Sequence, residues 1–194
     1  MKEIILASQS PRRKMLLEWA EIGFDVIVKH SEETYPEGLT HTQIAMHIAR
    51  SKALAVQKYV QKAFHAQLSH KTILAADTIV VLDEQVIGKP ANRQDALNIL
   101  RSLSGRKHLV ITGVVILHEK QENAFADTTE VSFHELTDAQ IEFYVDKYEP
   151  YDKAGAYAIQ EWIGVVGIQC INGDFYNVMG LPVSRVVQAL RNIE

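Results

Sequence analysis

Hydrophobic and polar positions along the chain follow two different periods, which predicts strands and helices that alternate. Apolar residues at every second position, or in a short unbroken run, are typical of β-strands. Repeats at three and four positions are typical of helices that bury one face. Strands are expected at residues 4–7, 24–28, 72–82, 86–88, 109–117, 124–133 and 167–171. Helices are expected at residues 11–22, 42–64, 94–103, 138–147 and 182–193.

The first helix carries a clear start signal. Ser10 can cap it with a hydroxyl, and Pro11 suits its first turn because proline lacks the N–H that would be unpaired there. Gly23 is expected to end the helix. The residues expected to face inward are Met15, Leu16, Leu17 and Trp19.

Turn residues indicate that neighbouring strands also pair as hairpins. Residues 83–85 separate the strands at 72–82 and 86–88, and a charged turn precedes the strand at 124–133. Asn172-Gly173 has the composition of a two-residue type I′ turn and predicts a hairpin with an extended segment at 175–177. Frequent hairpins favour an α/β fold with a mixed β-sheet flanked by helices over a purely parallel sheet.

Composition is that of an ordinary soluble domain. The chain has 194 residues, 47% of them hydrophobic and 23% charged, so residues 1–194 are expected to form a single domain or two closely packed lobes. The net charge of −4 argues against nucleic-acid and membrane partners. Cys170 is the single cysteine, no run is long enough for a membrane helix, and the start is unlike a secretory signal. These features predict a cytoplasmic protein.

Arg12 and Arg13 stand in the opening turn of the first helix, where their charges meet the positive end of the helix dipole. A bound anion would remove that penalty. Exposed N–H groups at the helix start, with the hydroxyls of Ser8 and Ser10, would complete a phosphate cradle. The alternative is two solvated arginines and an ordinary serine cap.

Asp77 is a carboxylate embedded in a strand whose other positions are apolar or small. An unpaired charge buried there would cost several kcal/mol. Asp77 could therefore lie at a sheet edge or pair with a structural arginine. The reading we favour is a site residue that holds a metal or takes a proton from water.

Further charged residues are candidates for the same site. Lys52 lies in a helix among alanines that leave room for its stem, and Lys89 follows a glycine at a strand end. The pair Glu32-Glu33 could supply a ligand for a divalent metal. A solvated lysine, a surface turn and a solvated acidic pair are the respective alternatives.

The segment 151–160 combines aromatic residues, Gly155 and the terminal amide of Gln160, which could bind the edge of a base; a packed loop is the alternative. The eight histidines show no metal-ligand spacing and are expected on the surface or satisfied in the core. The chain has no Walker P-loop, GxGxxG or GxSxG motif, which argues against the commoner phosphate, dinucleotide and serine-hydrolase sites.

Taken together, these segments resemble the Maf family of nucleotide pyrophosphatases, which shares a broad fold with the inosine triphosphate pyrophosphatases. The resemblance implies two lobes around a cleft, and it covers nearly the whole chain. Ala158, Glu32 and Gln43 depart from the family pattern, but none of them removes a charge that catalysis needs. The segments that carry the resemblance are 6–13, 32–33, 49–53, 76–80, 88–90, 104–106, 112–113 and 177–182.

The resemblance also implies roles. Asp77 would activate water, Glu33 would help to hold a divalent cation, Mg²⁺ or Mn²⁺, and Lys52 and Lys89 would engage the triphosphate. Segment 151–160 is similar to that of the dTTP/UTP group. The positions matching Arg13, Thr78 and Gln160 bear on substrate choice there, and Arg13 would also bind the triphosphate.

The expected reaction is hydrolysis of dTTP, UTP and modified pyrimidine triphosphates to the monophosphate and pyrophosphate. A 7-methyl-GTP or other noncanonical triphosphate is the alternative substrate. A nucleotide-binding regulator of cell division without catalysis is the alternative class. The sequence leaves a homodimer open.

Overall fold

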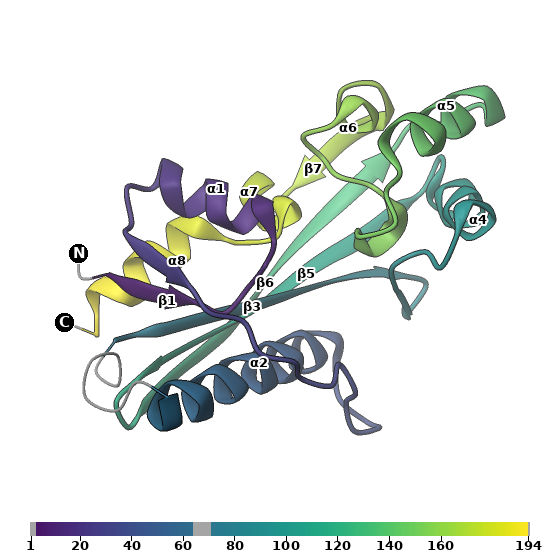
Figure 1. Cartoon of the computed structure of the whole chain (residues 1–194). Coiled ribbons are helices and arrows are strands. Elements are labelled where there is room, and N and C mark those ends of the chain that lie inside the picture. Colours follow the sequence, from purple (N-terminus) through teal and green to yellow (C-terminus); the bar gives the residue numbers. More distant parts are fainter. Residues whose placement is uncertain (1–2, 64–70, 194) are drawn as a thin grey trace. The chain divides into compact units, whose positions relative to one another are not determined.

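The computed structural model describes residues 3–63 and 71–193. Strands and helices alternate along these ranges, as the hydrophobic pattern predicted (Figure 1). The strands are β1 Ile4–Leu6, β2 Phe24–Val26, β3 Ile73–Leu82, β4 Gln85–Ile87, β5 Lys107–His118, β6 Gln121–Phe133 and β7 Ile168–Asn172. The helices are α1 Pro11–Trp19, α2 His41–Ala63, α4 Arg93–Leu103, α5 Asp138–Tyr148, η1 Ala154–Ala156, α6 Trp162–Gly167, α7 Phe175–Met179 and α8 Val183–Arg191.

The described strands form one seven-stranded sheet with the order β2-β1-β3-β5-β6-β7, and β4 pairs with β3 beside this path. β1 is parallel to both β2 and β3. The pairs β3–β4 and β6–β7 are antiparallel. The predicted mixed sheet flanked by helices is therefore confirmed.

The chain divides into two compact units. Unit 1 comprises the described parts of Met1–Asp77, Thr112–Asp127 and Gly180–Glu194, and unit 2 comprises Thr78–Ile111 and Thr128–Met179. Three of the four boundaries between the units fall inside strands β3, β5 and β6.

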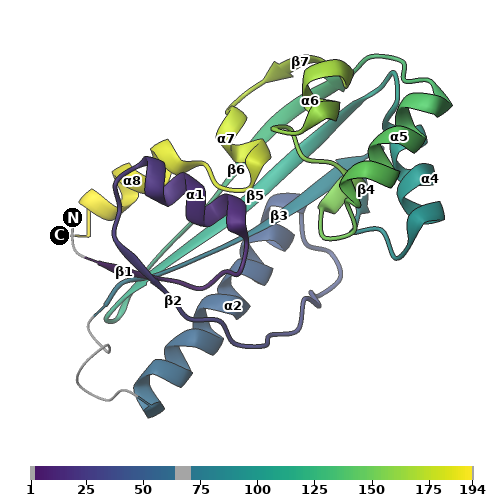
Figure 2. The same ribbon diagram turned by 45° about the horizontal axis from the view of Figure 1, so that its top comes forward.

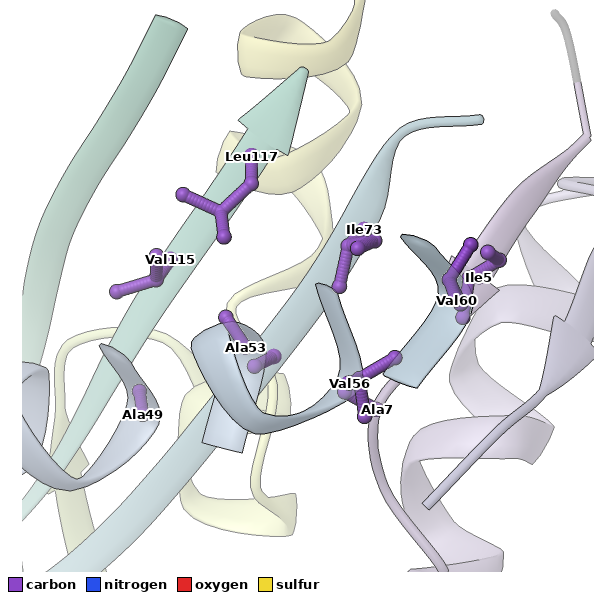
Figure 3. Close-up of a cluster of buried hydrophobic side chains, with 10 residues drawn as sticks. Ile5, Ala7, Ala49, Ala53, Val56, Val60, Ile73, Val115 and Leu117 are labelled. Carbon is purple, nitrogen blue, oxygen red and sulfur yellow. The ribbon is translucent and has the colours of Figure 1, made fainter. Parts of the chain in front are cut away.

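In unit 1, helix α2 packs a stripe of small and branched residues against three strands. The stripe and its partners lie together in Figure 3; they are Ala49, Ala53, Val56 and Val60 on the helix, and Ile5, Ala7, Ile73, Ala75, Val115 and Leu117. Helices α1 and α8 lie side by side on the opposite face of the strands (Figures 1 and 2). A Cβ atom at Gly113 of β5 would lie 2.3 Å from the backbone of Ala45 and Met46, so glycine permits the close approach of α2.

Side-chain caps begin several of the described helices. Ser10 accepts the Arg13 N–H before α1, as expected, and Asn92 accepts the Asp95 N–H before α4. Thr137 forms a capping box with Gln140 before α5. Each cap satisfies an N–H group that a helix start would leave without an intrahelical acceptor.

Two predictions for the first helices need correction. Trp19, expected inward, has 62% of its surface exposed because it ends α1, and the buried face consists of Arg13, Leu16 and Leu17. Helix α1 ends at Trp19, before Gly23. Strand β2 is also shorter than expected and ends at Val26. The predicted helix end at Phe64 lies outside the described residues.

The predicted hairpin at Asn172-Gly173 is wrong, because residues 175–179 form helix α7. Asp174 accepts the Tyr176 N–H at 2.8 Å, which favours a helical start over an extended strand. Strand β7 pairs instead with β6, where Asn172 opposes Glu130. Gly173 has φ +135°, and a Cβ atom there would lie 2.8 Å from Thr129 Oγ1. The glycine thus serves a close approach to β6.

Candidate active site

A lysine flanked by two carboxylates is the central feature of the candidate site in unit 1. Lys52 Nζ lies 2.6 Å from Asp77 Oδ1 and 2.7 Å from Glu33 Oε1. The side chains of Lys52, Asp77 and Glu33 are 21%, 13% and 51% exposed. The cluster therefore combines pairing with access to solvent at Glu33.

Each member of this cluster comes from a different segment. Lys52 projects from α2, and its neighbour Ala53 on the same helix packs in the core of unit 1. Asp77 lies on β3, and Glu33 lies in the polar loop between β2 and α2. Packing of α2 on β3 and β5 brings the ammonium of Lys52 to the carboxylate of Asp77.

This geometry decides between alternatives that the sequence left open. Asp77 lies on a strand inside the sheet order, with β1 and β5 as neighbours, between the residues that pair with β1 and those that pair with β4. The hydrogen-bonded partner of Asp77 is Lys52, where the alternative required an arginine. The alternative of a solvated helix lysine at Lys52 is wrong for the same reason, whereas Glu33 is both paired with Lys52 and half-exposed.

Arg13 binds within unit 1 through its guanidinium. Its Nε donates to the Gly180 carbonyl at 2.8 Å, and its Nη1 donates to Ser8 Oγ at 3.1 Å. Ser8 Oγ also accepts the Ser10 N–H at 3.2 Å. Arg13 is 9% exposed, so the alternative of a solvated arginine is wrong at this position. Ser10 does act as the ordinary cap, because its hydroxyl accepts the Arg13 N–H.

Burial lowers the pKa of the Arg13 guanidinium from its ordinary value. Asp77 opposes this effect, Arg12 adds to it, and Glu33 opposes it as well. Arg12 is half-buried on the first turn of α1. The guanidinium of Arg13 therefore lies close enough to Asp77 and Glu33 for their charges to act on it.

The other predicted site residues, Thr78, Lys89 and Gln160, belong to unit 2. Thr78 is half-buried on β3, and Lys89 and Gln160 are exposed. Gly155, with φ +71°, donates its N–H to the Gly88 carbonyl at 3.1 Å. This bond attaches the loop that carries Lys89 to the segment that precedes Gln160. A Cβ atom at Gly88 would meet nothing within 4 Å among the described residues.

Segment 153–159 is packed inside unit 2, which agrees with the alternative of a packed loop. Its neighbour Gln160 is exposed. The Tyr157 hydroxyl lies 2.7 Å from His108 Nε2, and Phe133 meets both rings edge to face. Burial raises the pKa of Tyr157 above its ordinary range. Ala158, which departs from the family pattern, does not have a left-handed backbone conformation.

His108 corrects the expectation that the histidines are exposed or satisfied. It is 2% exposed, and its Nδ1 has no hydrogen-bond partner among the described residues. Burial lowers the pKa of His108 to about 4. A neutral imidazole in the core of unit 2 follows.

Within residues 3–63 and 71–193, no group of three or more His, Cys, Asp or Glu side chains is arranged to hold a metal ion. Glu33 and Asp77 offer carboxylate oxygens, the ligand type that Mg²⁺ prefers, and Mg²⁺ commonly completes its shell with substrate phosphates. The residues at the cluster fit such an ion. None of the helices in the described part of the chain could cross a membrane.

The sequence model of the family described as "Maf-like protein" matches residues 3–193. The chain belongs to the Maf family. The resemblance predicted from its motifs is therefore confirmed over nearly the whole length.

Relatives in the Maf family carry the name dTTP/UTP pyrophosphatase. The protein of Cytophaga hutchinsonii is 47% identical over 98% of this chain and 84% of its own length. That of Halalkalibacterium halodurans is 46% identical over 98% of this chain and 96% of its own length. The Staphylococcus aureus Ham1 protein aligns at 17% identity and a TM-score of 0.44, over 68% of this chain and 72% of its own.

Sequence reasoning missed the partners that hold the Gln160 segment. Tyr144 and Glu161 hydrogen-bond to each other, and Tyr144 also binds the backbone of Ala158. The available signal was a tyrosine on the buried face of a helix, since a buried hydroxyl usually needs a partner.

Proposed function

We propose that this protein hydrolyses dTTP and UTP to the nucleoside monophosphate and pyrophosphate. Membership of the Maf family and the names of its relatives support this activity. The observation that carries it is the Lys52 ammonium between Asp77 and Glu33, because a base beside a cation is what phosphoryl chemistry requires.

In this mechanism Asp77 accepts a proton from a water molecule as the water oxygen attacks the α-phosphorus. A bond forms between that oxygen and the α-phosphorus, and the bond from the α-phosphorus to the bridging oxygen breaks. Pyrophosphate leaves with the electron pair. Lys52, Lys89 and Arg13 bind phosphate oxygens, and their charges offset the negative charge that develops on the leaving group.

A divalent cation, Mg²⁺ or Mn²⁺, would neutralise phosphate charge when bound, and Glu33 would hold it together with substrate oxygens. Glu33 suits this role because half of its side chain is exposed while one oxygen is anchored to Lys52. Lys52 keeps the two carboxylates close together by lying between them.

Substrate binding and specificity are assigned to Ser8, Arg12, Arg13, Thr78 and Gln160. The Gln160 amide offers one donor and one acceptor, which complement the edge of uracil or thymine. Cytosine reverses part of that pattern, so dCTP is expected to be a poor substrate. A single domain over residues 1–194 and a cytoplasmic location stay predictions from the sequence, and a homodimer stays open.

The test is release of monophosphate and pyrophosphate from a panel of nucleoside triphosphates with Mg²⁺ or Mn²⁺. The wild-type protein should turn over dTTP and UTP ahead of dCTP and 7-methyl-GTP. Asp77→Asn should lower kcat by about 10²- to 10⁴-fold, the range for loss of a general base. KM should change much less, since asparagine keeps the shape and an oxygen for Lys52.

Asp25→Asn is the matched control, because Asp25 is an exposed carboxylate of unit 1 that pairs with Lys71. It should leave kcat unchanged. Triphosphate binding without turnover by the wild-type protein would contradict the proposal and favour the regulator. Near-normal turnover by Asp77→Asn would remove Asp77 from the mechanism.

A further inference from the structure

Gln160 lies in a four-residue turn of unit 2. The Glu161 N–H donates to the Ala158 carbonyl at 3.1 Å, which closes the turn over residues 158–161. Gln160 is the third residue of this turn and is exposed, whereas Ala158 and Ile159 are buried. The side chain of Gln160 therefore reaches solvent from a turn whose preceding residues are packed inside unit 2.

One buried hydroxyl holds both ends of the turn. Tyr144 of α5 is 0% exposed. Its hydroxyl accepts the Ala158 N–H at 3.2 Å and donates to Glu161 Oε2. The backbone at one end and the side chain at the other are thus fixed to the same oxygen atom.

Lys153 extends this arrangement to the segment before the turn. Its ammonium lies 3.6 Å from Glu161 Oε1 and 2.7 Å from Asp152 Oδ1. Lys153 is only 8% exposed, and a buried charge is costly without partners. Both oxygens of Glu161 are therefore engaged, one by Tyr144 and the other by Lys153.

Helix α6 closes the other side of the turn. A Cβ atom at Gly164 would lie 1.7 Å from the Ile159 carbonyl oxygen, so the helix packs directly on the turn backbone. The Gly164 N–H also donates to the Glu161 carbonyl at 2.9 Å. The residues on either side of Gln160 are consequently held from two directions.

We propose that Tyr144, acting with Glu161 and Lys153, is a positioning group that sets the choice between keto pyrimidines and cytosine through Gln160. This inference rests on the proposed function of Gln160 as the base-selecting amide. Discrimination by two hydrogen bonds requires the amide to keep one place and direction, because a loose amide can adapt to the wrong base.

The test compares kcat/KM for dTTP and dCTP in Tyr144→Phe, which loses the hydroxyl and keeps the ring. The ratio of kcat/KM for dTTP to kcat/KM for dCTP should fall roughly tenfold, about the net contribution of one hydrogen bond. The change should lie mainly in KM for dTTP, since the charged cluster of unit 1 is untouched. Tyr148→Phe is the matched control, because Tyr148 belongs to the same helix and its ring stacks on Tyr144 at 5.0 Å.

Glu161 supplies a second pair of variants should Tyr144→Phe fail to fold. Glu161→Gln keeps an oxygen for the Tyr144 hydroxyl and should retain most of the selectivity. Glu161→Ala removes that oxygen and should lower the ratio as Tyr144→Phe does. A purely structural role would lower the melting temperature in these variants and leave the ratio unchanged.

The outcomes separate this inference from the function it rests on. A wild-type protein that prefers dTTP to dCTP, with variants that keep the same ratio, overturns the positioning role alone. A wild-type protein that turns over neither dTTP nor UTP overturns the proposed function and the inference with it. A ratio that falls in Tyr144→Phe and Glu161→Ala, and not in Tyr148→Phe, supports both.

Discussion

The Lys52 cluster of unit 1 and the Gln160 turn of unit 2 are held by different forces. In unit 1, Lys52, Asp77 and Glu33 are charged and partly exposed, and ion pairs join them. In unit 2, the turn that carries the neutral amide of Gln160 is held by hydrogen bonds of the buried residues Tyr144 and Tyr157.

The difference follows from what each group has to do. Groups that offset developing charge need a strong field and access to phosphate, and the ion pairs hold these side chains next to one another. A group that recognises a base needs a fixed direction, which buried hydrogen bonds supply. Changes in the Lys52 cluster should therefore affect rate, and changes around the Gln160 turn should affect selectivity and stability.

Lys52 is the cation that Asp77 and Glu33 share, and its removal should have the largest effect on rate. Lys52→Met should lower kcat/KM for dTTP by roughly 10²- to 10³-fold, the usual cost of one electrostatic donor, and leave the preference for dTTP over dCTP intact. Steady-state kinetics measure both quantities. Lys58→Met, at an exposed lysine of the same helix, is the control. A Lys52→Met protein within twofold of wild type would place catalysis elsewhere.

Acid should act on unit 2 through His108. The pKa of folded His108 is lowered to about 4, against an ordinary value of 6.5, so the unfolded chain binds more protons between these values. Its contribution to stability is complete above about pH 6.5 and is lost as the pH falls toward 4, by roughly 3 kcal/mol in total.

Urea unfolding at several pH values measures this loss. His108→Gln should flatten the dependence of the unfolding free energy on pH in that window. The exposed His30 provides the control, since His30→Gln should leave the slope as it is in the wild type. Equal slopes in the wild type and His108→Gln would contradict a buried neutral imidazole.

Packing beneath the unit 1 cluster gives a smaller effect. Gly113→Ala places a Cβ atom 2.3 Å from the α2 backbone and should cost about 1–3 kcal/mol of unfolding free energy, the usual range for overpacking. Gly88→Ala has open space and should cost nothing. Urea titration of both variants measures the difference. A Gly113→Ala protein as stable as Gly88→Ala would show that α2 can move away freely.

The sequence predicted the sheet and most of its helices because their signals are local. Alternation along 72–82, the Ser10 cap and the Asp83-Glu84 turn each act within a few residues. The Asn172-Gly173 pattern was misleading because Asp174 precedes helix α7 and accepts an N–H group at its start. The pairing of β7 with β6 joins residues 35 to 42 positions apart in the chain.

The charged residues of the candidate site were also visible in the sequence, since Asp77 and Arg13 are unusual where they stand. Their partners were not. The bonds from Lys52 to Asp77 and from Arg13 to Gly180 join residues far apart in the chain. Tyr144 looked like an ordinary core residue, because nothing in a helical stripe tells which backbone its hydroxyl will meet.

The central claim is attack of water on the α-phosphorus of a pyrimidine triphosphate, and its most direct test is hydrolysis of dTTP in water labelled with oxygen-18. Mass spectrometry of the products locates the label. The account predicts one labelled oxygen in thymidine monophosphate and none in the pyrophosphate released with it. Label in pyrophosphate, or release of inorganic phosphate as the first product, would contradict it.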